Sequence, residues 1–147
     1  MQVLEQIPGH IRFILETNGI LLGHDATYAR DLSRFENLYV RMSMKGASEA
    51  EFTSLTGAEP AGFELQIQAL ENMARFKITG HPAVMISFSS TDKIKALRRR
   101  LRQIHEGFEG FEVEELVLYG KVEERLTKAG LIYDTAHEPA CIPPEQV

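Results

Sequence analysis

Four short, nearly continuous apolar segments, each ending in polar residues, constrain the fold of this chain more than any other feature. We expect them to be strands at residues 11–16, 38–43, 83–88 and 113–119. A helical pattern follows each one, and strands that alternate with helices indicate parallel neighbours joined by right-handed crossovers. The predicted order is therefore β-α-β-α-β-α-β-α, which forms either half of a (β/α)₈-type barrel or a small open sheet.

The segments between the strands carry apolar residues three or four positions apart, as amphipathic helices do. Asp25 is a good N-cap for the first of them, and Ser48 with Glu51 resembles a capping box for a short additional helix. Gly130 is expected to end the last one as a C′ residue. The main helices are expected at about residues 26–35, 61–76, 92–105 and 121–129.

The length of 147 residues favours one domain with a sizeable core. We expect a single α/β domain over residues 1–132, followed by a proline-containing tail over 133–147 that is extended on the surface or disordered. Residues 1–9 resemble the end of a helix, closed by Pro8-Gly9. The segment from Gly107 to Gly110 precedes a strand and is expected to be a loop.

Composition excludes some classes of function and location. The net charge of -5 argues against general nucleic-acid binding. No apolar run approaches the roughly 20 residues that cross a bilayer, and the start of the chain lacks the pattern of a signal peptide. A cytoplasmic location without membrane partners is the resulting expectation.

Cys141 is the one cysteine, and it lies in the proline-containing tail. It cannot form an internal disulfide or, alone, a thiolate metal cage. This chain by itself is therefore not expected to hold an iron–sulfur cluster through the usual cysteine ligands. The five histidines show no ligand-type spacing, so no metal site is expected.

In parallel α/β folds, ligands bind at the carboxyl ends of the strands. A carboxylate at the end of a buried strand needs a partner or a ligand, so Glu16 either pairs with Lys45 as a structural ion pair or recognises a small molecule. The residues that this rule selects are Glu16, Thr17, Asn18, Ser43, Lys45, Ser87, Ser89 and Tyr119. Phosphate-binding glycine motifs and nucleophile elbows are absent from the sequence. His81 begins a predicted strand, at the end opposite this site, and is expected to be structural.

Glu16-Thr17-Asn18-Gly19 at one predicted strand end and Ser43-Met44-Lys45 at the next resemble the radical S-adenosylmethionine enzymes, closest to the activating-enzyme-like members. The likeness extends over about residues 4–132 and includes His81-Pro82-Ala83-Val84-Met85. It implies strands three to six of a partial (β/α)₆ barrel. It also implies contacts with S-adenosylmethionine from Glu16, Thr17, Asn18, Ser43, Lys45 and Ser87.

The sequence departs from that family at its start. The family's Cys-x-x-x-Cys-x-x-Cys cluster loop and its Gly-Gly-Glu-like motif have no counterpart here, and the chain begins within the helix that would follow the second strand. The resemblance therefore implies a truncated or split domain without radical catalysis of its own, which retains part of an S-adenosylmethionine pocket. The alternatives are a non-catalytic small-ligand-binding or interaction domain derived from that fold, and an unrelated small α/β enzyme.

A half-barrel leaves two strand edges and one sheet face without neighbours. We expect the inner face of the curved sheet to be apolar and association to cover it. The expected partner is a second copy of the chain, as a homodimer, or a separate subunit that supplies the missing first strands. Alternatively, the tail covers one of the two edges.

Overall fold

The structure is a computed structural model that describes residues 2–144. The strands are β1 (Phe13–Thr17), β2 (Leu38–Lys45), β3 (Gly80–Met85) and β4 (Glu112–Glu114). The helices of the described residues are α1 (Gln2–Gln6), α2 (Ile20–His24), α3 (Ala26–Leu32), α4 (Glu49–Thr56), α5 (Ala61–Arg75), α6 (Thr91–Ile104), α7 (Glu106–Glu109) and α8 (Val122–Ala129). No helix in this range is long and apolar enough to cross a membrane.

The strands form one parallel sheet in the order β1-β2-β3-β4, which is also their order in the sequence. The α/β class and the parallel sheet are thus confirmed. The register places Glu16 of β1 beside Arg41 of β2, and Arg41 beside His81 of β3. Because all the pairs are parallel, the carboxyl ends of the four strands lie at the same end of the sheet.

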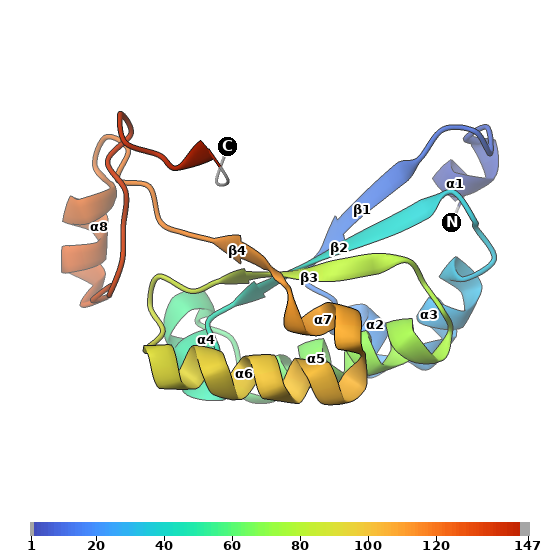
Figure 1. The fold of residues 1–147 in the computed structure, drawn as a ribbon, viewed down its shortest axis with the longest axis horizontal. Coiled ribbons are helices and arrows are strands. Elements are labelled where there is room, and N and C mark those ends of the chain that lie inside the picture. Colours follow the sequence, from blue (N-terminus) through green and yellow to red (C-terminus); the bar gives the residue numbers. More distant parts are fainter. Residues whose placement is uncertain (1, 145–147) are drawn as a thin grey trace.

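The helices α2 to α7 cover one face of this sheet (Figure 1). The side chains that β2 turns toward them are Leu38, Val40, Met42 and Met44, all of them buried. They pack in one apolar core with residues such as Ile67 and Leu70 of α5 and Leu101 of α6. Burial of this face, at roughly 25 cal/mol per Å² of apolar surface, is the main stabilisation of the fold.

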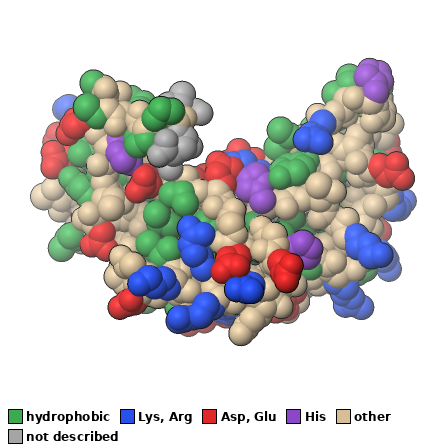
Figure 2. All heavy atoms as spheres, viewed as in Figure 1, with side chains coloured by type: hydrophobic (Ala, Val, Ile, Leu, Met, Phe, Trp, Pro, Cys, Tyr) green, Lys and Arg blue, Asp and Glu red, His purple; other side chains and the backbone are tan. Residues whose placement is uncertain are grey.

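Among the described residues, no helix crosses the middle of the opposite face of the sheet. Figure 1 shows β1 and α1 raised at one end of it, with α8 and the C-terminal segment raised at the other. The space-filling view shows the resulting hollow, with acidic, basic and histidine side chains near its floor (Figure 2). Parallel strands are usually covered on both faces, so this uncovered face is unusual.

The burial of β1 differs from the expected one. Its apolar run predicts a strand that is covered on both sides, but Ile14 and Glu16 are exposed, and their neighbours are half-buried. The cause is its position, because β1 is the outermost strand of the sheet and lies at the rim of the uncovered face. The continuous apolar pattern of its sequence does not reveal that position.

The expected fourth strand at 113–119 is also wrong in extent, because β4 ends at Glu114. Beyond it, the N–H of Leu116 donates to Ser87 Oγ. The N–H of Leu118 donates to the carbonyl of His137, which pairs this segment with the C-terminal tail. The apolar residues after Glu114 therefore contact the C-terminal segment rather than continue the sheet. Residues 145–147 of the predicted tail lie outside the described residues.

Two short helices occupy segments for which no helix is predicted. α2 occupies the short apolar piece after Gly19, where Asn18 Oδ1 accepts from the N–H of Ile20. α7 occupies the expected loop before β4, and His105 caps it by accepting from the N–H of Gly107. The N-caps predicted at Asp25 and Ser48 are confirmed, since each side chain accepts from a backbone N–H of the helix that follows. The capping box is incomplete, because Glu51 Oε2 accepts from the N–H of Ala47 instead of that of Ser48.

Candidate functional site

The uncovered face of the sheet gathers most of the polar side chains that the strands carry. Successive residues of a strand point to opposite faces, so alternate positions of β2 share this surface. We call this surface the open face. Its residues are Ile14, Glu16, Tyr39, Arg41, Ser43, Lys45, His81, Ala83, Met85, Glu112 and Glu114. The expectation of an apolar inner face is therefore wrong.

Arg41 lies at the centre of the charged groups on the open face. Its Nη1 contacts Glu16 Oε1 at 2.8 Å, and its Nη2 contacts Glu112 Oε1 at 2.6 Å and Glu114 Oε1 at 2.8 Å. Its Nε also donates to the second oxygen of Glu112. One guanidinium thus joins β1, β2 and β4, and its planar fork suits this paired recognition of carboxylates.

These contacts shift the ionisation of the groups. The bonds to Glu112 raise the pKa of Arg41, while the Arg41 bond lowers the pKa of Glu112 from 4.5 to about 2. Burial alone would raise the pKa of Glu114, but its bonds to Lys45 and Arg41 outweigh burial and lower that pKa. Glu112 and Glu114, the two carboxylates of the cluster with a lowered pKa, therefore favour the charged form near neutral pH.

His81 extends this charged cluster toward Tyr39. His81 Nε2 lies 2.6 Å from Glu112 Oε2, and its Nδ1 lies 2.8 Å from the Tyr39 hydroxyl. The carboxylate thus binds one imidazole nitrogen, and the second imidazole nitrogen faces a hydroxyl. Such an arrangement can transfer a proton. His81, expected to be structural and outside the site, therefore belongs to the open-face cluster.

Glu16 and Lys45 do not pair with each other. Glu16 contacts Arg41, and Lys45 Nζ contacts Glu114 Oε2 at 2.7 Å. The reason is the register, because Glu16 lies beside Arg41, whereas Lys45 lies four residues further along β2. Both side chains remain accessible, with 63% of Glu16 and 41% of Lys45 exposed.

The other predicted site residues are divided between the open face and the connecting segments. Ser43 lies on the open face between Arg41 and Lys45. Thr17 Oγ1 accepts from the N–H of Gly19, so Thr17, like Asn18, shapes the turn into α2. Ser87 is fully buried and holds the C-terminal segment, since its carbonyl accepts from the N–H of Asp134.

Ser89 and Tyr119 also lie apart from the open-face cluster. Ser89 is buried, and its hydroxyl donates to Glu51 Oε2. Lys93 Nζ donates to the other carboxylate oxygen of Glu51, Oε1. This buried carboxylate joins the loops after β2 and β3, and its bonds outweigh burial and lower its pKa. Tyr119 is exposed in the segment that leads to α8.

Neither an iron–sulfur cluster nor a single metal ion fits the residues that the structure describes. Residues 2–144 contain no group of three histidine, cysteine or acidic side chains that could hold a metal, and Cys141 is exposed in the tail. We therefore derive no step through an iron–sulfur cluster. The fit to S-adenosylmethionine is partial, because Glu16, Ser43 and Lys45 share one face, whereas Ser87 is already occupied by protein contacts.

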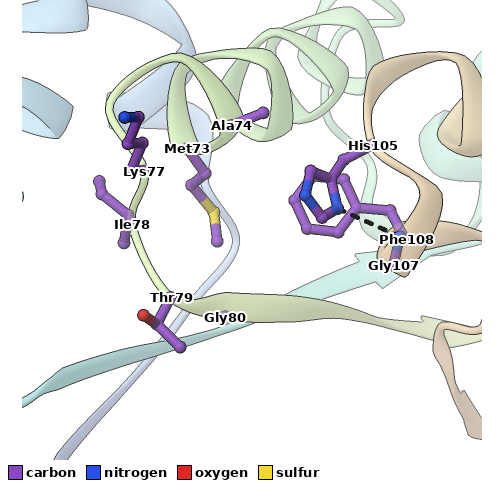
Figure 3. Close-up of a pocket in the computed structure, with 9 residues that line it drawn as sticks. All are labelled: Met73, Ala74, Lys77, Ile78, Thr79, Gly80, His105, Gly107 and Phe108. Carbon is purple, nitrogen blue, oxygen red and sulfur yellow. Dashed lines mark hydrogen bonds between the residues drawn. The ribbon is translucent and has the colours of Figure 1, made fainter.

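A separate pocket of about 350 Å³ lies at the amino-terminal end of β3. Figure 3 shows the His105 ring against Phe108 on one side of it and the segment from Lys77 to Gly80 on the other. His105 Nδ1 is engaged by the N–H of Gly107, and Lys77 is the one permanently charged lining residue. This pocket therefore offers less chemistry than the open face.

Sequence reasoning selected strand ends and missed the strand interiors. Arg41, His81, Glu112 and Glu114 were not singled out, although Arg41 alternates with Ser43 and Lys45 along one strand. The spacing of Glu112 and Glu114 carries the same signal. A search for polar residues two apart within a strand would have found Arg41, Glu112 and Glu114. It would not have found His81, since the residue two positions further along β3 is Ala83.

Comparisons with known protein families, curated proteins and solved structures found no match.

Proposed function

We propose that this chain is a β/α half-barrel domain that binds a small molecule with a cationic group on its open face. We further propose that it resembles part of a radical S-adenosylmethionine domain and that it does no radical chemistry on its own. A sequential strand order with the main helices on one face supports the half-barrel, because open doubly wound sheets reverse their order and carry helices on both faces. S-Adenosylmethionine, suggested by the sequence resemblance, is the first ligand to test.

The charge of the open face is the observation that carries the proposal. Its three carboxylates, Glu16, Glu112 and Glu114, exceed its two permanent cations by one, which favours a ligand with positive charge. S-Adenosylmethionine carries a sulfonium, an ammonium and a carboxylate. Glu16 is the most exposed of the three acids and suits the ammonium, and Lys45 is accessible to the carboxylate.

Calorimetric titration of the full chain with S-adenosylmethionine tests this function. S-Adenosylhomocysteine is the matched ligand, because it keeps the amino-acid group and lacks the sulfonium charge. We expect the first to bind more tightly than the second. Glu16→Gln should weaken binding about tenfold or more, as expected for the loss of a hydrogen bond to a charged group. Glu59→Gln, at an exposed loop position, should leave the affinity unchanged.

The absence of heat at millimolar ligand, or an equal effect of both substitutions, would contradict the proposal. In that case a second function gains support, in which the chain is an interaction domain whose barrel is completed by another subunit. The uncovered parallel sheet favours this alternative, because such sheets are normally covered on both faces. Co-expression with the adjacent genes, followed by purification on a tag, would reveal a stable partner.

A further inference from the structure

β1 has one side without a neighbouring strand in the described part of the chain, because it is first in the sheet order. The N–H of Phe13 donates to the carbonyl of Asn37 at 2.8 Å, so Phe13 turns its backbone groups toward β2. Leu15 and Thr17 follow the same alternation. Ile14 and Glu16 therefore direct their N–H and C=O groups away from the sheet, toward solvent.

This edge lacks most of the features that usually prevent strand pairing, and Glu16 is the one charged residue of β1. β1 contains no proline, lysine or bulge, and its Ile14 side chain is 60% exposed. An exposed apolar strand with free backbone groups is a template for another strand. The other edge of the sheet differs, because β4 is three residues long and Val113 has interactions of its own.

We propose that two copies of the chain pair through β1, antiparallel, about a twofold axis that passes beside Ile14. A symmetric dimer uses the same surface on both subunits, so an edge that pairs with itself must be self-complementary. The segment from Arg12 to Glu16 meets this condition. With Ile14 opposite the partner's Ile14, Arg12 lies opposite the partner's Glu16, and Phe13 lies opposite the partner's Leu15.

Each of these pairs is favourable. The two exposed Ile14 side chains cover one another, and Phe13 meets the partner's Leu15 on the helix-covered side of the sheet. Arg12 is exposed, and Glu16 contacts Arg41 of its own chain through Oε1, which leaves Oε2 for the partner's Arg12. Opposite charges and apolar pairs directly across two strands stabilise a sheet.

Other registers are less favourable on the same edge. A shift that centres the axis on Leu15 places each Ile14 opposite a carboxylate. A shift that centres it on Glu16 places two carboxylates opposite one another, which is destabilising. In the proposed register, Ile14 and the partner's Ile14 also exchange two backbone hydrogen bonds, as directly opposed residues of this kind do. The charged pairs, the apolar pairs and the outward backbone groups thus all favour the register that is centred on Ile14.

Sedimentation of the full chain over a wide concentration range tests the dimer. We expect a reversible monomer–dimer equilibrium and an increase of about tenfold or more in the dissociation constant for Ile14→Pro, which removes an outward N–H that no strand of its own chain uses. Ile14→Thr is the matched control, since it keeps the N–H and a β-branched side chain. It should weaken the dimer less than the proline does. Circular dichroism checks that both variants are folded.

Oxidative cross-linking tests the register. In a Cys141→Ser background, Ile14→Cys should form a disulfide-linked dimer, because directly paired residues bring their Cα atoms to about 5.5 Å. Glu16→Cys should not cross-link, since its copies lie on opposite sides of the axis. A chain that is monomeric at every concentration would overturn the proposal, and so would preferential cross-linking at residue 16. Glu16 takes part in both proposals, but the dimer is measured without ligand and through substitutions of Ile14, so either proposal can fail alone.

Discussion

Replacement of Arg41 by methionine tests whether the open-face cluster is held together by one guanidinium. Arg41→Met keeps much of the apolar stem and removes the cation that joins Glu16, Glu112 and Glu114. Only 20% of the Arg41 side chain is exposed, so water compensates poorly for the loss. Three carboxylates are then left with Lys45 and His81 as their partners in the cluster.

The magnitude follows from the ionisation of Glu112. The fall in its pKa from 4.5 to about 2 corresponds to roughly 3 kcal/mol. Because 42% of its side chain is exposed and part of the shift comes from His81, the share that Arg41 supplies is about 1–2 kcal/mol after solvent screening. The weaker contributions of Glu114 and Glu16 bring the expected loss for Arg41→Met to about 2–3 kcal/mol at pH 7.

The pH dependence separates this explanation from simple loss of packing. A carboxylate whose pKa is lowered by folding stabilises the protein above its unfolded pKa, and this contribution is lost as the pH falls toward its folded pKa. For Glu112 that interval runs from 4.5 down to about 2. The difference between wild type and Arg41→Met should therefore fall to about half by pH 3.

Urea unfolding followed by far-UV circular dichroism at several pH values measures both quantities. Arg30→Met is the matched control, because the Arg30 side chain is 63% exposed and pairs with exposed Asp31. It should change the free energy of unfolding by less than about 0.5 kcal/mol. A loss for Arg41→Met that is the same at pH 7 and pH 3 would refute the electrostatic reasoning.

Two further substitutions test the helix packing and the C-terminal segment. Gly23→Ala would place a Cβ 1.9 Å from the Leu65 carbonyl oxygen, so α2 and α5 must separate, and we expect a loss of roughly 3 kcal/mol in thermal or urea unfolding. Gly110→Ala, which meets nothing within 4 Å, should be nearly neutral, and equal losses would contradict the packing argument. Ser87→Ala removes the acceptor of the Leu116 N–H, so limited proteolysis within residues 116–144 should accelerate while the core keeps its stability. An unchanged cleavage rate would show that this bond does not hold the segment.

The class of fold was predictable because it depends on local patterns. Apolar runs, helical spacing and caps such as Asp25 are properties of neighbouring residues, and they determine the alternation of strands and helices. The extent of β4 was not predictable, because residues 116–118 are as apolar as a strand. Their environment is set by Ser87 and His137, which are distant in the sequence.

The candidate site was predictable in part for a related reason. Glu16, Ser43 and Lys45 share a face because the alternation of side chains along a strand is fixed. The partner of Glu16 depends on register, which a single sequence does not specify, and one alignment of β1 with β2 selects Arg41 instead of Lys45. Glu112 and Glu114 joined the cluster only through the position of β4 beside β3.

The identical order of strands in the sequence and in the sheet has a consequence for how the protein is made. β2, β3 and β4 each pair with the strand synthesised just before, so the sheet can grow by one β/α unit at a time as the chain leaves the ribosome. No strand has to wait for a later segment to be inserted beside it. Because β1 is synthesised before the other three strands, its outer edge is exposed to neighbouring nascent chains for longer than theirs.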